Sequence, residues 1–264
     1  MEQAPRHCPS CESDRATRID AYSRDGWDVV ACDDCGFVFL RNPPSYEALE
    51  EDFAWEKTYV EKKKKGGSTR LSGLARSLRG RIDGARRRRA HAHLAQAFGA
   101  GRVLDIGCGY GKRITAPMTP FGIEISKGLW QRSDALMRSQ GGFCVHGAGA
   151  EGIWSFEPGF FDGILMHSYL EHETEVARVL SGAHRALKPG GKVFVRVPNF
   201  GSLNRRIVGP KWCGFRYPDH VNYFTLSSLR SVAAKAGFDT TLVNRINLWV
   251  DDNIQVLLTK RPAA

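Results

Sequence analysis

From Arg102 onward, the hydrophobic pattern switches between two periodicities. Short apolar runs, typical of buried strands, alternate with longer stretches in which apolar residues recur every three or four positions, as on one face of a helix. This alternation predicts an α/β fold built on a doubly wound, mostly parallel sheet. Strands are predicted at 102–106, 121–125, 143–146, 161–166, 192–197, 240–248 and 254–260. Asp251-Asp252-Asn253 predicts a hairpin turn between the last two, so one terminal strand should be antiparallel.

Residues 1–41 have a different pattern, with short strand candidates at 18–22, 27–31 and 36–40 and a turn at Asp25-Gly26. Two Cys-x2-Cys pairs flank these strands: Cys8 with Cys11, and Cys32 with Cys35. Two such turns can supply the tetrahedral four-thiolate site that structural zinc prefers. The segment is therefore predicted to be a zinc ribbon, too small to fold without its metal.

Residues 42–98 are predicted to form a helical, basic linker or lid, whose last helix runs from Ala85 to Phe98 and ends at Gly99. The chain has a net charge of +10, and the stretch from Glu61 to Arg89 holds twelve Lys or Arg and two acids. The basicity therefore belongs to this segment. The remaining chain, including the predicted α/β domain at 99–264, is balanced.

The composition of the chain limits the classes of protein to which it can belong. The 264 residues, 42% hydrophobic and 25% charged, suit a soluble globular protein with one α/β domain and a small appendage. No apolar run reaches the roughly 18 residues that a membrane helix needs, and the first residues do not resemble a signal peptide. A cytoplasmic, reducing location is expected, which favours zinc over disulfides. Of the other cysteines, Cys108, Cys144 and Cys213 are expected to be small buried side chains.

The candidate chemistry lies where the first two strands of the α/β domain end. Gly107, Gly109 and Gly111 follow the strand at 102–106, and Glu124 closes the next strand. Glycines let a backbone approach a ligand closely, and a carboxylate at a strand end can accept both hydroxyls of a ribose. The third glycine follows the second by two positions, whereas dinucleotide sites place it three positions later. A nucleoside without a pyrophosphate is therefore favoured.

This Asp-x-Gly-x-Gly-x-Gly form resembles motif I of class I S-adenosylmethionine (SAM)-dependent methyltransferases of the small-molecule type. The resemblance extends over 99–264, through Leu170-Glu171-His172 after the fourth strand, Leu187-Lys188-Pro189-Gly190-Gly191 before the fifth, and Pro218-Asp219-His220. It implies a Rossmann-like seven-stranded sheet in the order 3-2-1-4-5-7-6.

The resemblance also implies a cofactor site. Its residues would be Asp105, Gly107, Cys108, Gly109, Gly111, Glu124, Ala150, Glu151 and His167. Ala150 and Glu151 would line the adenine, and His167 would lie against the methionine. Many relatives carry an acid for the adenine amino group where this chain has Gly149. A second departure is the short span from Gly111 to Glu124, where Pro117 is expected to cut the helix to about a turn and a half.

A hydroxyl acceptor must lose a proton, and histidine is the natural general base. His172 is the first candidate and His220 the second, with a structural role as the alternative for each. The Asn-Pro-Pro-aromatic motif of adenine and amide N-methyltransferases is missing after the fourth strand, where His167-Ser168-Tyr169-Leu170 stands. A small-molecule or glycan-precursor hydroxyl is therefore favoured over a nucleobase.

Two alternatives stay open. The ribbon and basic segment could bind RNA, as in zinc-containing ribosomal RNA methyltransferases, although few aromatic residues accompany the basic run. The segment could instead tether the protein to an anionic membrane or a carrier-bound polysaccharide intermediate, or be a solvated linker. The oligomeric state cannot be inferred.

Overall fold

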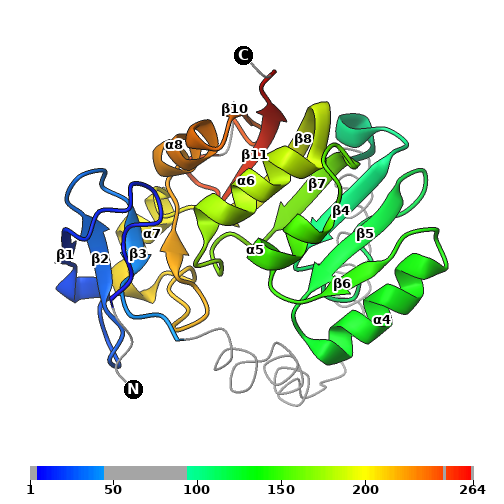
Figure 1. Ribbon diagram of the computed structural model, residues 1–264. Helices are drawn as coiled ribbons and strands as arrows, with labels where there is room; N and C mark the ends of the chain where they lie inside the picture. Colours follow the sequence, from blue (N-terminus) through cyan, green and yellow to red (C-terminus); the bar gives the residue numbers. More distant parts are fainter. Residues whose placement is uncertain (1–4, 45–93, 246–247, 263–264) are drawn as a thin grey trace, which may run out of the picture.

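A mixed, seven-stranded sheet forms the centre of the molecule in the computed structural model, which describes residues 5–44, 94–245 and 248–262 (Figure 1). Its strands are β4 (Arg102–Ile106), β5 (Thr119–Glu124), β6 (Cys144–His146), β7 (Phe161–His167), β8 (Leu187–Pro198), β10 (Phe238–Leu242) and β11 (Asn253–Lys260). Their order is β6-β5-β4-β7-β8-β11-β10. Numbered from β4 as the first strand, this reads 3-2-1-4-5-7-6. Only β11 runs antiparallel to its neighbours, β8 and β10, within this sheet.

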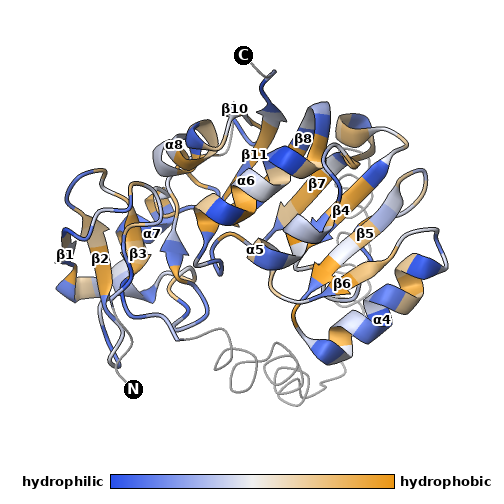
Figure 2. Cartoon of the chain, viewed as in Figure 1, coloured by the Kyte–Doolittle hydropathy of each residue, from blue (hydrophilic) through white to orange (hydrophobic). Residues whose placement is uncertain are grey.

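Helices pack on the sheet and fix its edges. They are α4 (Lys127–Arg138), α5 (Gly149–Gly152), α6 (Val176–Ala186), α7 (Leu203–Val208) and α8 (Leu226–Lys235), with short 3-10 turns at Asp20–Tyr22, Ile153–Ser155 and Gly209–Lys211. Apolar residues dominate the central strands, whereas α4 and α6 carry polar residues on part of their surface (Figure 2). Ser126 caps α4, and Thr225 with Ser228 forms a capping box on α8. The sequence pattern therefore matches the sheet-and-helix layers.

Residues 94–98 are helical and end at Gly99, whose φ of +68° gives the left-handed C-terminal stop that the sequence predicts. Leu94 and Phe98 pack beneath the sheet with Val103 and Leu165. The rest of the predicted linker or lid, including the basic stretch from Glu61 to Arg89, lies outside the described residues.

The helix expected between Gly111 and Glu124 is absent, which corrects the prediction of a helix of a turn and a half. Residues 112–118 form a loop, with Ile114 and Met118 buried under the sheet. Pro117 lacks an amide donor and disfavours helical geometry at the residue before it, so a segment this short has no room for a helix.

The predicted strand at 240–248 is also wrong in its position. β10 ends at Leu242 and β11 begins at Asn253, so the two strands are farther apart in the sequence than the predicted hairpin turn allows. Asn244 explains the end of the strand. Its amide nitrogen donates to Asn253 O (2.8 Å), and its amide oxygen accepts from Gln255 N (3.1 Å). The side chain thus replaces the ladder bonds that a longer strand would make.

The N-terminal segment builds a second sheet from β1 (Ala16–Arg18), β2 (Val29–Cys32) and β3 (Val38–Leu40). Asp25 and Gly26 both have positive φ, so the predicted turn is present, but residues 20–22 form a 3-10 turn where a strand was expected. The fourth strand, β9 (Asn222–Tyr223), comes from the α/β part of the chain and pairs with β3 (Figure 1). No sequence pattern predicts this pairing.

A joint core lies beneath this second sheet. Val29 and Leu40 pack with Phe200, Trp212 and Tyr223. The N-terminal segment therefore has a hydrophobic core shared with the α/β part, whereas the sequence suggested a ribbon with almost no core.

Trp212→Ala is expected to lower the free energy of unfolding by about 3–5 kcal/mol, the usual cost of deleting a buried tryptophan. Trp212 is 2% exposed, and its indole N–H donates to Asp252 Oδ1 at 3.0 Å. Trp249→Ala is the matched control, because Trp249 is 68% exposed. Urea unfolding measures both, and equal small losses would contradict the shared core.

Cys213 is exposed, 4.0 Å from Asp252 Oδ2, which corrects its expected burial; Cys108 and Cys144 are buried as predicted. Among the described residues, no helix combines the length and the apolar character needed to cross a bilayer.

Candidate functional site

The glycine loop follows β4 at the carboxyl edge of the sheet. Gly107, Gly109 and Gly111 have φ of +69°, +58° and +68°, a conformation that disfavours residues with a side chain. A methyl group added at Gly111 would approach Ser133 Cβ to 3.0 Å, and one at Gly107 would approach the Tyr169 ring to 3.1 Å. At Gly109 nothing lies within 4 Å of the added atom. The loop is therefore packed on both sides and open at its middle glycine.

Glu124 holds this loop in place. Its Oε2 accepts a hydrogen bond from Gly109 N (2.7 Å), and its Oε1 accepts one from Ser126 N (3.0 Å). Glu124 is 7% exposed. Burial raises the pKa of its carboxyl, although the two amide donors oppose this shift. Each carboxylate oxygen has a second lone pair, so both can accept a further hydrogen bond from a ligand.

Asp105 lies at the end of β4 and is 1% exposed. Its Oδ2 meets Arg113 Nη1 at 3.3 Å, while no described residue donates to Oδ1. Burial raises the pKa of Asp105 to about 7, although Arg113 opposes this shift. Arg113 comes from the loop that replaces the expected helix, and sequence reasoning missed it. An unpartnered buried oxygen next to an open glycine loop suits a polar ligand.

The thiol of Cys108 is buried. It lies 3.5 Å from Cys144 Sγ and packs with Met137. The hydrogen bond with the Cys144 thiol, together with burial, raises the pKa of Cys108, so the group stays a neutral thiol. Its backbone remains the part that can contact a ligand.

The expected adenine side is formed by β6 and α5. Ala150 is buried at 2% exposure, and Glu151 is exposed. The structure also explains why Gly149 stands where many relatives have an acid. A Cβ there would lie 2.1 Å from Tyr169 Oη and 2.6 Å from Ile106 Cγ2. Tyr169 Oη instead donates to Glu173 Oε2. No side chain fits at position 149 without moving the tyrosine.

His167 ends β7 and lies beside Arg196 of β8, its register partner. No described residue bonds to His167 Nδ1, and burial, with Arg196 and Arg113 nearby, lowers the pKa of His167 to about 4. Arg196 Nη1 donates to Ser168 Oγ at 3.1 Å. The imidazole is thus neutral and offers a lone pair or an N–H at the strand end. The sequence pattern did not single out Arg196.

His172 and His220 come together from segments that are far apart in the sequence, with ring centroids 4.7 Å apart and ring planes at 85°. His172 Nδ1 bonds to Asp219 O (2.7 Å), and His220 Nδ1 bonds to Gly214 O (2.8 Å). Burial lowers the pKa of His172 to about 4 and that of His220 to about 3. Because a carbonyl can only accept, each Nδ1 carries the proton and each Nε2 carries a lone pair.

Glu171 adjoins this pair and was not among the sequence candidates. It is 2% exposed, no described residue donates to its Oε2, and burial raises the pKa of Glu171 to about 8. Glu171, His172 and His220 each place one metal-ligating atom within 4.8 Å of the other two.

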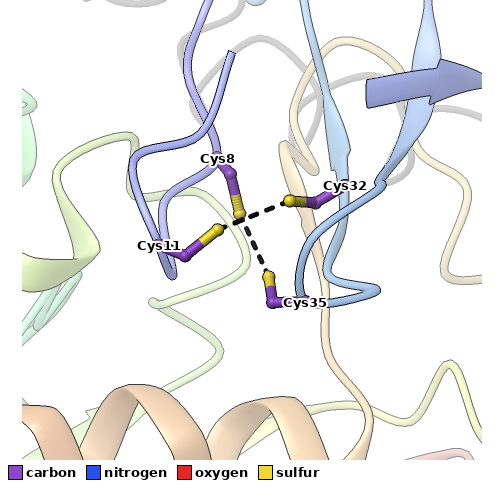
Figure 3. A group of neighbouring side chains, drawn as sticks. All are labelled: Cys8, Cys11, Cys32 and Cys35. Carbon is purple, nitrogen blue, oxygen red and sulfur yellow. Dashed lines mark hydrogen bonds between the residues drawn. The ribbon is translucent and has the colours of Figure 1, made fainter. Parts of the chain in front are cut away.

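The four N-terminal cysteines also converge, within 4.8 Å of one another (Figure 3). Cys8 Sγ lies 3.5 Å from Cys35 Sγ, and Cys11 Sγ lies 3.4 Å from Cys32 Sγ. The two turns share one geometry. The residue after each second cysteine, Glu12 or Gly36, has a positive φ, and its N–H donates to the carbonyl of the first cysteine. The donor set is compatible with a zinc ion.

Two side chains, Arg6 and Lys235, tie this cysteine cluster to the α/β part of the chain. Arg6 Nη2 donates to Thr174 O at 2.6 Å, and Arg6 Nη1 donates to Val221 O at 3.3 Å. Lys235 of α8 donates to Ser10 O inside the first cysteine turn. Through Arg6, the N-terminal segment is hydrogen-bonded close to both segments that carry the paired histidines.

Taken together, the Rossmann-like sheet and an open glycine loop anchored by a strand-end carboxylate define a SAM-dependent methyltransferase. The family model for the methyltransferase domain matches residues 76–243, and the chain belongs to this family.

Curated relatives point to the same class. A ubiquinone biosynthesis O-methyltransferase of Burkholderia pseudomallei is 27% identical over 202 residues, covering 66% of this chain and 82% of the relative. The same enzyme of Burkholderia vietnamiensis is 36% identical over 125 residues, covering 45% of this chain and about half (49%) of the relative. A SAM-dependent methyltransferase from Archaeoglobus fulgidus superposes with a TM-score of 0.54 at 17% identity, covering 66% of this chain and 92% of that structure. That similarity concerns the fold.

Proposed function

We propose that this protein transfers a methyl group from SAM to a hydroxyl oxygen of a small molecule or glycan precursor. The observation that carries the proposal is the His172–His220 pair, in which both Nδ1 protons are held by carbonyls and both Nε2 lone pairs are left available. A neutral imidazole lone pair is what a general base requires. The names of the curated relatives, which are O-methyltransferases of ubiquinone biosynthesis, support an oxygen acceptor.

Bound SAM supplies an activated methyl group: the acceptor oxygen bonds to the methyl carbon while the carbon–sulfur bond breaks and its electron pair passes to sulfur. Glu124 would accept the ribose hydroxyls, and the unpartnered Oδ1 of Asp105 would face the ribose or methionine. Gly107, Gly109 and Gly111 would bring the backbone against the ligand. Ala150 and Glu151 would line the adenine through a backbone amide and apolar contact, and His167 would flank the methionine end.

His172 is the proposed base, with His220 second. The acceptor hydroxyl would pass its proton to Nε2, and the carbonyl of Asp219 would steady the imidazolium through Nδ1–H. Catalysis otherwise consists of holding the acceptor oxygen in line with the methyl group.

His172→Asn is expected to lower kcat at least about 100-fold while leaving binding of S-adenosylhomocysteine unchanged. The asparagine amide can still donate to Asp219 O, so the variant removes Nε2 and keeps the local hydrogen bond. Activity is measured on the acceptor found in a panel of metabolites and nucleotide sugars, read by mass spectrometry. Near-normal turnover in His172→Asn would remove this residue as the base, and a panel without methylated product would contradict the hydroxyl acceptor.

We also propose that Cys8, Cys11, Cys32 and Cys35 hold one structural zinc ion. The cluster geometry supports this, since four thiols fill all tetrahedral positions and leave none for substrate. Burial raises the pKa of Cys8 and Cys11, whereas at Cys32 burial is opposed by hydrogen bonds from the amides of Cys35 and Asp34 and from neighbouring thiols, which together lower the pKa to about 7. The RNA and membrane-tether alternatives rest on the basic stretch outside the described residues, so the small-molecule reaction is preferred.

A further inference from the structure

The cluster of Glu171, His172 and His220 is built into the fold. Glu171 and His172 follow β7, and His220 precedes β9. The two segments are joined by Val221 N and Asn222 N, which both donate to Glu171 O at 2.7 and 3.1 Å. Asn222 Nδ2 adds a bond to Leu170 O at 2.7 Å. The three side chains are thus held facing one another by buried backbone contacts.

The hydrogen bonds around the cluster leave the Nε2 atom of each histidine as an acceptor. Both Nδ1 atoms donate outward, to Asp219 O and Gly214 O. This leaves the Nε2 lone pairs of His172 and His220, and neither Nε2 bonds to another described residue. The buried Oε2 of Glu171 likewise has no donor among the described residues. Two imidazole lone pairs and one buried carboxyl oxygen thus lie within 4.8 Å of one another.

Such an arrangement costs free energy unless a cation occupies it. Arg196 and Arg216 act on Glu171 through their charges, yet within the described chain neither forms an ion pair with it. Imidazoles that ligate metals typically donate their other N–H to a backbone carbonyl, which fixes ring and tautomer as it is fixed here for both histidines. Ligand atoms about 2.1 Å from one ion lie about 3.4 Å apart, so small side-chain movements close the cluster.

We infer that Glu171, His172 and His220 bind one divalent cation, separate from the four-cysteine site. Two imidazoles and one carboxylate suit Mn²⁺, Fe²⁺, Co²⁺ or Zn²⁺ better than Mg²⁺ or Ca²⁺, which prefer oxygen ligands. Three protein ligands leave coordination positions open, where an acceptor hydroxyl can bind.

This inference rests on the proposed function and deepens it. A hydroxyl oxygen on the cation loses its proton to solvent water more readily, and the resulting alkoxide or phenolate attacks the methyl carbon. In the cation-loaded protein, His172 is a ligand of the cation. The cation, in place of the His172 lone pair, then activates the acceptor hydroxyl. The acceptor class narrows to hydroxyls that can reach a metal, such as phenols and catechols.

The test is titration with Mn²⁺ of the full chain carrying one zinc ion per chain, at the four cysteines, followed by electron paramagnetic resonance of the free ion. The soft thiolate site does not favour Mn²⁺, so the two sites are read separately. One saturable Mn²⁺ per chain is expected in the unaltered protein. Glu171→Gln and His172→Asn are expected to bind it at least about tenfold more weakly. His184→Asn, which changes a histidine of α6 outside the cluster, is the matched control and should bind normally.

Absence of saturable Mn²⁺ binding in the unaltered protein overturns the inference, as does equal binding in all variants. Circular dichroism checks that each variant is folded. If a variant is unfolded, Mn²⁺ binding by the unaltered protein decides the test. The two proposals fail separately. If the protein methylates an acceptor but does not bind Mn²⁺, the proposed methyl transfer stands and the cation site is wrong. If it binds Mn²⁺ but no acceptor is methylated, the cation site stands and the proposed methyl transfer is wrong.

Discussion

Glu124→Ala is expected to weaken SAM binding by about 100- to 10,000-fold. The substitution removes the two oxygens that would accept the ribose hydroxyls, and hydrogen bonds to a charged acceptor contribute about 1.5–3 kcal/mol each. It also frees Gly109 N and Ser126 N, which Glu124 holds at 2.7 and 3.0 Å. The glycine loop then loses its side-chain anchor on β5 and keeps the backbone bonds from Gly107 N and Cys108 N to Ile123 O. Isothermal titration calorimetry with SAM and with S-adenosylhomocysteine measures the loss.

Glu124→Gln separates the two effects. Its amide oxygen can replace one acceptor, while its amide nitrogen faces a backbone donor, so an intermediate loss of affinity is expected. Glu151→Gln is the control, because Glu151 is exposed and is proposed to contribute through its backbone. Unchanged heats in Glu124→Ala would remove the proposed cofactor site and leave the methyltransferase assignment without a working ligand pocket.

Cys8→Ser is expected to release the zinc ion and to unfold the N-terminal segment. Structural zinc contributes about 10–16 kcal/mol of apparent binding free energy in small zinc domains at neutral pH. Cys8 is 1% exposed and joins the same hydrophobic cluster as Val30 and Phe37. Metal analysis of the purified protein should fall from one zinc per chain to near zero, and the thermal unfolding midpoint should fall with it.

Cys213→Ser is the matched control, since Cys213 is an exposed cysteine outside the cluster. It should keep both its zinc and its melting temperature. The effect of Cys8→Ser should also reach the acceptor side of the site. Arg6 bonds to the carbonyls of Thr174 and Val221, next to the segments that carry His172 and His220. A raised KM for the acceptor with unchanged SAM binding is therefore expected in whatever folded fraction remains, and unaltered zinc content would refute the site.

Hydrophobic periodicity located most of the large sheet. The strand at 102–106 has the predicted bounds, and those at 143–146, 161–166 and 254–260 begin or end within one residue of prediction. The strands β4 and β7 are buried on both faces, so their apolar runs reflect local sequence directly. Errors occurred where a side chain or a proline decides the local structure. Asn244 ends β10 early, and Pro117 removes a helix.

The candidate site was predictable where chemistry follows the chain closely. The glycines, Glu124 and the two cysteine pairs are local motifs at strand ends or tight turns. Arg113, Arg196 and Glu171 were missed, because each matters only through neighbours that are distant in sequence. Glu171 was visible in the Leu170-Glu171-His172 motif, but nothing local showed that its carboxyl would be buried without a donor.

By itself, the sequence determined the α/β class, the positions of most strands, and the residue types that a methyl donor and a metal require. These features depend on periodicity and short spacings, which act within one turn or one strand. Only the tertiary structure decided that β9 completes the N-terminal sheet, that Tyr169 excludes a side chain at position 149, and that Glu171, His172 and His220 share one buried cluster. Each of these depends on segments that meet only after the chain has folded, and their contacts leave no periodic pattern in the chain.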